Sequence, residues 1–507
     1  MLFSELELPG FLIDAIDASI KHVYSYGPMA EKTVVLVPEV LSSQVGNVAE
    51  AIGMDTETVS YVLGMFLCYP LGLIMLGIPY GKSRHLFSFL LGAFLLQFTL
   101  GVQWIHHLIS SLVAYAMILV LPRKHLKTVL PIFAVAYITL GHLHRQYINY
   151  LGWDLDFTGS QMVLTQKLYM IAFNLYDGEV LAQGKDDRAA KKLAKYSLKE
   201  VPGILEFLGY MFCFSTILAG PASEYITYAR ACDGSAFKTP SGKPCKVPSN
   251  VIPTLKPLFI SLFCLGVHLT LSPMFPLLNQ THPQTDTPFI LQEDFLAKPW
   301  VLRFFHCWMG LFALREKYYF GWKNAEGASN VWYSGFDGFD EDGNSLGWES
   351  SNNINILGFE LAQDLQSATK NWNIKTSFWL TRYVYMRTNG NLFAVYSLSA
   401  FWHGFYPGYY MFFLSVPLPT ICDRMAKKKL GPYFSKSKYT LYGALSFLAT
   451  SITMNYMILP FVMLAYTWSW DAYETNYFFG HIGCVIYYIV LTMLPKPKVA
   501  DDKKKVA

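Results

Sequence analysis

Long apolar runs recur along this chain, and they constrain its fold more than any other feature. Of its 507 residues 53% are hydrophobic and only 15% are charged, whereas a soluble protein usually has about 25% charged residues. A membrane-spanning helix needs about 20 apolar residues, so we expect roughly ten or eleven spans, some tilted or partly inserted. The runs lie near residues 59–80, 86–121, 129–143, 162–176, 203–220, 251–271, 304–314, 392–416, 441–466 and 477–494.

This pattern predicts an all-α polytopic membrane protein with one transmembrane domain over residues 1–507. The run 86–121 is long enough for two spans if the helix breaks near residues 103–107. Residues 1–50 form a mixed N-terminal segment, and residues 318–389 are too polar to cross lipid and too aromatic for a disordered linker. We expect residues 318–389 to be a folded re-entrant or cytosolic insert that packs against the helices.

Charge and targeting signals place the chain in a compartment. The net charge is only +4, and no motif points to nucleic acid. Basic residues cluster between the apolar runs, which favours the cytosolic side for those connections. The tail 495–507 is basic and ends Lys504-Lys505-Val506-Ala507, which is similar to the dilysine signal that retrieves membrane proteins to the endoplasmic reticulum. Such a tail must face the cytosol.

The cysteines are predicted to be free thiols. Eight are present, five of them inside apolar runs, and no C-x-x-C pair occurs, so neither a metal site nor a disulfide framework is predicted. Cys232 and Cys245 could pair only if their loop is lumenal. Asn279 begins a glycosylation sequon, which has meaning only if that loop is also lumenal.

His403 is the strongest candidate for chemistry. It lies near the middle of the run 392–416, which we interpret as membrane-spanning, and an ionisable side chain at that depth is costly unless it faces a protein cavity. Burial lowers the pKa of an imidazole, so a neutral His403 could accept a proton as a general base. A histidine on such a helix can equally be a core residue bonded to a nearby carbonyl.

Competing motifs are weaker. His106-His107 and His142-x-His144 are close pairs, but adjacent or i, i+2 side chains point to different sides of a helix and no carboxylate lies at ligand spacing. The string Gly343-Asn-Ser-Leu-Gly347 matches G-x-S-x-G but lies in a turn-rich stretch without the strand-to-helix context that this motif needs. The His-x4-Asp pattern of soluble-type glycerolipid acyltransferases is absent from the sequence.

Several segments together resemble the membrane-bound O-acyltransferase family, in particular its lysophospholipid acyltransferase branch. The resemblance covers about residues 55–430. The segments, in chain order, are Val163-Leu-Thr-Gln-Lys-Leu168, Asn174-Leu-Tyr-Asp-Gly178, Ile217-Leu-Ala-Gly-Pro-Ala-Ser-Glu-Tyr225, Gly335-Phe-Asp-Gly-Phe-Asp340, Asn371-Trp-Asn-Ile-Lys-Thr-Ser-Phe-Trp-Leu-Thr-Arg-Tyr383 and Ser399-Ala-Phe-Trp-His-Gly-Phe-Tyr-Pro-Gly-Tyr-Tyr410.

The resemblance implies a bundle of about eleven spans around a central tunnel, in the endoplasmic-reticulum membrane. It implies transfer of a fatty acyl group from acyl-CoA, a co-substrate, to the free hydroxyl of a lysophospholipid, with no separate cofactor, metal or covalent intermediate. His403 matches the essential histidine. Asn373 matches its partner asparagine; the Trp before it and the Ile-x-Thr after it favour Asn373 over Asn371. Aromatic and basic residues nearby are candidate substrate contacts: Trp372, Trp379, Arg382, Trp402 and Tyr406.

Other readings remain. The same fold serves acylation of sterols, diacylglycerol and secreted proteins, although the match around His403 favours lysophospholipids. A transporter could use an intramembrane histidine as a proton relay, but the paired internal repeats common in transporters are not evident. The sequence leaves open the headgroup among choline, ethanolamine, serine and inositol, the preferred acyl chain, and whether the protein is a homodimer.

Overall fold

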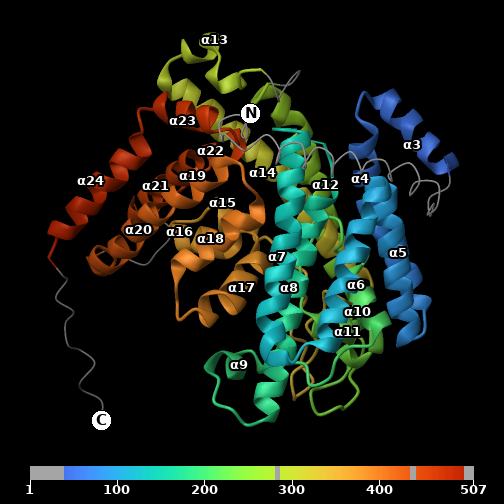
Figure 1. Cartoon of the computed structure of the whole chain (residues 1–507). Coiled ribbons are helices and arrows are strands. Elements are labelled where there is room, and N and C mark those ends of the chain that lie inside the picture. The colour runs from blue at the N-terminus through green and yellow to red at the C-terminus, as the bar shows by residue number, and fades with distance from the viewer. Residues whose placement is uncertain (1–38, 153, 280–285, 434–440, 496–507) are drawn as a thin grey trace, which may run out of the picture.

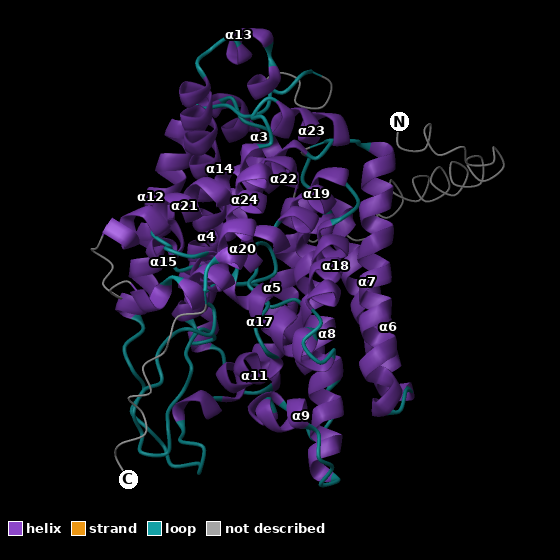
Figure 2. Ribbon diagram, turned by 90° about the vertical axis from the view of Figure 1, so that its left-hand side faces the viewer, coloured by secondary structure: helices purple, strands orange, loops and turns teal. Residues whose placement is uncertain are grey.

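The structure, a computed structural model, describes residues 39–152, 154–279, 286–433 and 441–495. The described residues form α-helices and short 3-10 turns, and their only β-type pairings are two isolated bridges, Lys238 with Pro244 and Phe339 with Ser345 (Figures 1 and 2). The all-α prediction is confirmed for this part of the chain. The dilysine residues and most of the N-terminal segment and basic tail lie outside the described residues.

The helices fall into long elements that form the body and shorter ones that complete it. The longer helices are α3 (Glu39–Ile52), α4 (Thr56–Gly77), α5 (Lys82–Leu100), α6 (Ile105–Val120), α7 (Arg123–Ile148), α8 (Phe157–Ala182), α12 (Val251–Met274), α14 (Trp300–Val331), α18 (Leu392–His403), α20 (Pro417–Lys429), α21 (Leu441–Met457) and α24 (Phe479–Met493). The shorter helices are α9 (Arg188–Lys192), α10 (Ile204–Met211), α11 (Tyr225–Asp233), α13 (Glu293–Leu296), α15 (Ile356–Glu360), α16 (Leu365–Asn371), α17 (Ile374–Tyr383), α19 (Pro407–Ser415), α22 (Leu459–Met463) and α23 (Tyr466–Glu474).

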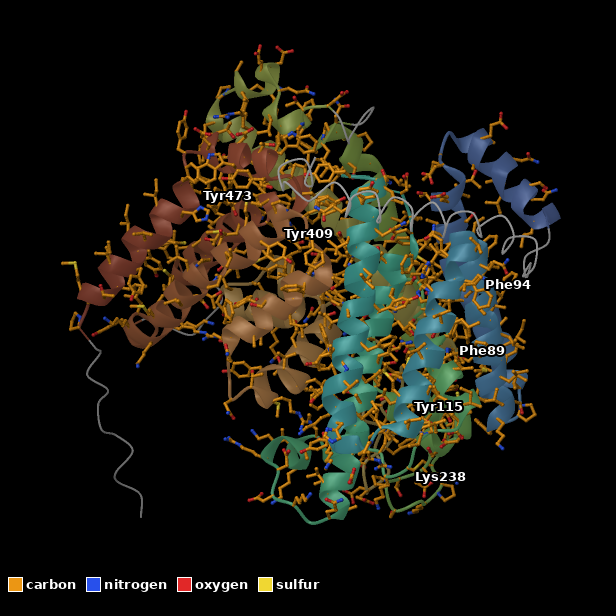
Figure 3. All side chains as sticks on the ribbon, viewed as in Figure 1. Phe89, Phe94, Tyr115, Lys238, Tyr409 and Tyr473 are labelled. Atoms are coloured by element: carbon orange, nitrogen blue, oxygen red, sulfur yellow. The ribbon has the colours of Figure 1, made fainter. Side chains whose placement is uncertain are left out.

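Two pairs of long helices organise the body. α7 packs along α8, and α14 packs along α12 while also contacting α4. The helices α17 to α24 gather beside α7 and α8, on the opposite side from α3 to α5 (Figure 1). Tyr409 and Tyr473 are labelled within this C-terminal group, while Phe89 and Phe94 mark α5 at the other edge (Figure 3). Within this C-terminal group, α17 contacts α8 and α18 contacts α7.

Five helical stretches in the described residues are long and apolar enough to cross a membrane: 56–77, 82–120, 123–148, 251–274 and 441–463. A sixth candidate is the bent pair α23 and α24, with a 63° bend between them. The break expected near residues 103–107 exists as a 3-10 turn at Gly101–Trp104. The stretch around this turn nevertheless qualifies as one candidate span and not as the expected two.

Several of the predicted spans are not long, continuous apolar helices. The number of helices that are long and apolar enough to cross a membrane is therefore lower than the roughly eleven expected. The run 162–176 lies in α8, whose polar side chains Gln161, Gln166 and Lys167 are buried among other helices. The Lys167 ammonium donates to the carbonyl oxygen of Tyr210 at 2.9 Å. A helix enclosed by protein need not be apolar on every face, because protein groups satisfy its polar atoms.

The run 392–416 is not one span, which corrects our interpretation of the segment around His403. It is divided into α18, of 12 residues, and α19, of 9 residues, and each is too short to cross a bilayer. Gly404 ends α18 with φ 120°, a conformation that favours glycine, and Pro407 begins α19. His403 is therefore the last residue of a short helix.

The stretch 318–389 begins inside α14, which continues to Val331. Turns follow and include the bridge between Phe339 and Ser345. The short helices α15, α16 and α17 then lead towards α18. Arg315 of α14 forms an ion pair with Glu360 of α15 at 2.7 Å. This contact fastens the start of the short helices to α14.

Candidate functional site

The His403 side chain lies among aromatic rings. Its ring centroid is 4.8 Å from that of Trp402, 5.0 Å from Phe461, 5.5 Å from Phe413 and 5.8 Å from Tyr409. Within the described part of the chain, no group hydrogen-bonds to either nitrogen of this imidazole. A ring nitrogen of His403 is thus available to a bound molecule.

Helices α7 and α8 fix the residue just before His403. The indole Nε1 of Trp402 donates to the carbonyl oxygen of Met162 in α8 at 2.9 Å. The Trp402 carbonyl, one of those that a helix end leaves without an intrahelical partner, accepts from Nε2 of His142 in α7 at 3.1 Å. Both bonds come from buried groups, so the end of α18 is held at a defined position.

Asn373 is the N-cap residue of α17 and has a left-handed backbone, with φ 43°. Asparagine tolerates this conformation better than most residues. Its Oδ1 accepts from Nδ2 of Asn353 at 3.1 Å, and no described residue accepts from its own Nδ2. The Asn373 amide therefore has one end fixed by protein and one donor end available.

Asn371 differs from Asn373 in its hydrogen bonds. Its Nδ2 donates to the carbonyl oxygens of Ser367 at 2.8 Å and Gly358 at 3.2 Å. Its own carbonyl oxygen accepts from the backbone N–H of Asn355. These bonds tie the end of α16 to α15 and engage the Nδ2 of Asn371, unlike that of Asn373.

Asn373 and His403 do not contact each other, but residues next to each of them bond to adjacent turns of α8. Gln166 Nε2 donates to Thr376 Oγ1 near the start of α17 at 2.9 Å. Met162, which holds Trp402, lies one turn earlier on α8, about 6 Å along the helix axis. The start of α17 and the end of α18 thus approach consecutive turns of the same helix.

The five predicted substrate contacts are largely engaged with protein. Trp379 is fully buried, with its ring 5.8 Å from that of Trp402. The Tyr406 hydroxyl accepts from the backbone N–H of Leu151 at 2.9 Å. Trp372 packs against Phe359 and Trp322, with ring centroids 4.9 and 5.0 Å away. Their role in substrate binding stays a prediction.

Arg382 belongs to a buried polar cluster centred on Glu224. Its Nη1 lies 3.1 Å from Glu224 Oε1. The Tyr383 hydroxyl lies within hydrogen-bond distance of both this carboxylate, at 2.9 Å, and Asn174 Oδ1, at 2.8 Å, while Asn174 Nδ2 donates to Glu224 Oε2 at 3.0 Å. Three segments that are far apart in the sequence, and that each contributed to the family resemblance, therefore meet at one carboxylate.

The competing sequence motifs do not form sites in the described residues. His106 bonds to Tyr137, at 3.0 Å, while His107 is buried beside Phe212, so the pair diverges as expected. Gly343–Gly347 lies in turns, without a strand-to-helix junction. All eight cysteines are free thiols in the structure, Cys232 and Cys245 among them.

Three residues of this site were not identified from the sequence: Asn353, Glu224 and His142 in its contact with Trp402. Asn353 lies in the run Asn352-Asn353-Ile354-Asn355, an unusual density of amides in the insert. Glu224 is the one acidic residue in the segment 217–225. Those patterns could have indicated that Asn353 and Glu224 are structurally important polar residues. Their hydrogen-bond partners, and that of His142, could not be predicted, because they are 20 to about 260 residues away in the chain.

Comparison with known proteins identifies the class. The family model of the membrane-bound O-acyltransferase family matches residues 108–468. Membrane-bound glycerophospholipid O-acyltransferase 2 of Gallus gallus is 30% identical over 436 residues, covering 83% of this chain and 81% of that protein. Membrane-bound glycerophospholipid O-acyltransferase 1 of Homo sapiens is 28% identical, covering 88% and 92%. The lysophospholipid acyltransferase of Schizosaccharomyces pombe is 27% identical, covering 89% of each chain.

The protein is a multi-pass membrane enzyme of the O-acyltransferase class. The chain belongs to the membrane-bound O-acyltransferase family, as its sequence motifs predicted. His403, Asn373 and the other site residues described above all lie inside the matched range.

Proposed function

We propose that this enzyme transfers a fatty acyl group from acyl-CoA to the free hydroxyl of a lysophospholipid, of the choline, ethanolamine or serine type, in phospholipid remodelling. The observation that carries the proposal is the similarity, over more than four-fifths of the chain, to proteins named glycerophospholipid O-acyltransferase and lysophospholipid acyltransferase. The aromatic surroundings of His403 suit a reaction between two lipid substrates.

In the proposed reaction His403 is the general base. The lysophospholipid hydroxyl oxygen attacks the thioester carbonyl carbon, and its proton passes to an unoccupied imidazole nitrogen of His403. The resulting tetrahedral intermediate collapses with cleavage of the carbon–sulfur bond, and the CoA thiolate receives the proton that the imidazolium returns. The products are a diacyl phospholipid and CoA. The acyl group moves directly, without an acyl-enzyme.

Asn373 has the complementary task of donation. Its Nδ2–H groups would hold the carbonyl oxygen of the thioester as negative charge develops there. One oriented donor of this kind contributes about 10² to 10³ in kcat. The opposite end of the amide is occupied by Asn353, which supports this assignment because a fixed donor loses little energy in reorienting.

His403→Ala tests the base role. In purified protein, supplied with labelled acyl-CoA and a lysophospholipid, we expect kcat to fall by at least about 10²-fold, the range of general-base catalysis. His306→Ala is the matched control. His306 also lies among aromatic rings, those of Phe275, Phe289 and Phe295, but it has no part in the proposed reaction. Normal turnover by His403→Ala would reject the base role.

Asn373→Ala and Asn371→Ala separate the two asparagines. Asn373→Ala should lower kcat by about 10²-fold, because it removes one oriented donor, whereas kcat of Asn371→Ala should stay near the native value. Asn373→Ala should also lower the melting temperature, because Asn353 Nδ2 loses its acceptor and alanine is strained at φ 43°. Asn371→Ala should lower the melting temperature, because it leaves the Ser367 and Gly358 carbonyls without their donor. The reverse pattern would assign the donor role to Asn371.

A panel of acceptors tests the substrate class. Lysophospholipids with choline, ethanolamine, serine and inositol headgroups should be acylated in preference to a sterol or diacylglycerol. Acylation of sterol alone would overturn the lysophospholipid assignment. Flux of a solute across proteoliposomes without acyl transfer would instead support the transporter reading.

We further propose the family's architecture of about eleven spans around a tunnel, an endoplasmic-reticulum location and a cytosolic C-terminus. The basic clusters between the spans and the Lys504-Lys505 ending support this orientation. Replacing both lysines by alanine should move a tagged protein out of the endoplasmic reticulum. If the location is unchanged, the two lysines do not act as a retrieval signal, and they no longer support an endoplasmic-reticulum location.

A further inference from the structure

Asn353 determines which end of the Asn373 amide faces the reaction. An amide has a donating nitrogen and an accepting oxygen of similar size, and only the nitrogen can stabilise an oxyanion. Whether Asn373 can stabilise an oxyanion therefore depends on the rotation of its amide about χ2. Asn353, which is 2% exposed, forms a hydrogen bond of 3.1 Å with its side chain.

The orientation follows from a chain of hydrogen bonds with a fixed beginning. The backbone N–H of Lys375 can only donate, and it lies 2.9 Å from the Asn353 side chain, so the atom that receives it is Oδ1. The Asn353 Nδ2 therefore points the other way, towards Asn373 at 3.1 Å. The Asn373 atom opposite a donor must be Oδ1, which leaves Asn373 Nδ2 on the open side.

Asn353, and not Asn373, accepts the hydrogen bonds of the first N–H groups of α17. An asparagine at this position ordinarily uses Oδ1 to accept from the second or third N–H of the helix. In α17 the Asn373 side chain makes no such bond. Asn353 instead accepts from the first two N–H groups, with its carbonyl oxygen for Ile374 at 2.8 Å and its Oδ1 for Lys375 at 2.9 Å.

From this geometry we propose that Asn353 is a positioning residue that keeps the amide nitrogen of Asn373 directed at the thioester carbonyl. This inference rests on the proposed donor role of Asn373. Asn353 itself touches neither substrate. Its effect on the rate passes entirely through Asn373.

Asn353→Asp is the informative substitution. Aspartate has the same shape, and its one carboxylate oxygen still accepts from Lys375, so the cap of α17 is kept. Its other oxygen replaces the donor that faces Asn373. The Asn373 amide then turns over to donate to this carboxylate, a charge-assisted bond stronger than the original, and presents its oxygen to the reaction.

The experiment compares kcat, the KM for each substrate and the melting temperature in purified protein in lipid nanodiscs. We expect Asn353→Asp to lower kcat by about 10²-fold, the value of one oriented donor, with KM near that of the native enzyme. The melting temperature should fall, because the new carboxylate stands at a position that is 2% exposed. Asn355→Asp makes the same chemical change at an exposed N-cap two residues away. It should leave kcat unchanged.

The double variant Asn353→Asp/Asn373→Ala distinguishes positioning from other effects. If Asn353 acts through Asn373, the double variant has the kcat of Asn373→Ala alone. A direct influence of the new carboxylate on substrate, or damage to the fold, would persist in that background and multiply the two losses, which overturns the proposal.

The two single variants keep the failures apart. Native kcat in Asn353→Asp together with a loss in Asn373→Ala would overturn positioning while leaving the donor role intact. Native kcat in Asn373→Ala would overturn the donor role and, with it, the positioning proposal.

Discussion

Position 404 requires a residue without a side chain. Its φ of 120° is strained for any other residue, and a Cβ built there would lie 3.3 Å from the ring of His142. The same ring holds the Trp402 carbonyl. Gly404 thus lets α18 end directly after His403 while His142 packs against the turn.

We predict that Gly404→Ala displaces His403. The φ of 120° forces the backbone of this turn to change, and the His142 ring must give by a few tenths of an ångström. A shift of about 1 Å near the reacting atoms can cost 10² in rate, so acyl transfer by the purified variant should fall by up to about that factor. Gly483→Ala is the control, because Gly483 has open space around it and no positive φ. Equal activity of the two variants would show that the turn tolerates a side chain.

At the level of elements, α17 is held from both ends. Asn353 caps its beginning, and the cluster around Glu224 fixes its last two residues, Arg382 and Tyr383. The Arg382 guanidinium also lies over the rings of Tyr196 and Phe378, 4.6 and 4.5 Å from their centroids. A helix of 10 residues is marginal alone, so these contacts give α17 its position.

We predict that Glu224→Ala destabilises the protein strongly. Removal of one partner from a largely buried ion pair leaves the other charge uncompensated and costs about 3–5 kcal/mol. The side chains of Glu224 and Arg382 are 7% and 20% exposed. Thermal unfolding in detergent should show a clearly lowered midpoint.

The control for Glu224→Ala is an exposed pair in the same protein. Lys191 and Asp186 approach within 2.8 Å, but their side chains are 60% and 88% exposed. Asp186→Ala should leave the unfolding midpoint unchanged, since water screens such pairs. If both alanine variants unfold at the native midpoint, the Glu224 cluster does not hold α17.

Across the whole molecule, α12 presents a broad apolar surface. Ile252, Phe259 and Phe263 are 74%, 65% and 70% exposed, while the other side of the helix packs along α14. Apolar side chains exposed on a helix of 24 residues are stable in lipid, not in water. We infer that this face of α12 meets the acyl chains of the bilayer.

Phe263 lies near the middle of α12, and Phe263→Arg tests this orientation. An arginine at the centre of a span costs about 2.5–3.5 kcal/mol on insertion scales. The variant should yield less folded protein in the membrane fraction. Leu346→Arg, at an exposed loop position outside the candidate spans, should have native yield. Equal yields would place this face of α12 away from lipid.

The sequence by itself determined the class of fold and pointed to His403 and Asn373 as candidate functional residues. Apolar runs predict helices in a membrane because lipid offers no partner for an open backbone, and the motifs around His403 and Asn373 are local strings that can be recognised without coordinates. The same local view failed for the run 392–416. Apolar composition alone does not reveal where Gly404 and Pro407 divide a segment into two short helices.

Only the tertiary structure decided how the site is held. Glu224 gathers Asn174, Arg382 and Tyr383, and His142 reaches Trp402 from 260 residues away. Asn353 sets the direction of the Asn373 amide from a separate segment. A sequence specifies which side chains can donate or accept, but each bond also needs two groups at about 3 Å in the right orientation. Packing of distant helices supplies that geometry, which is why the family could be predicted from local motifs and these contacts could not.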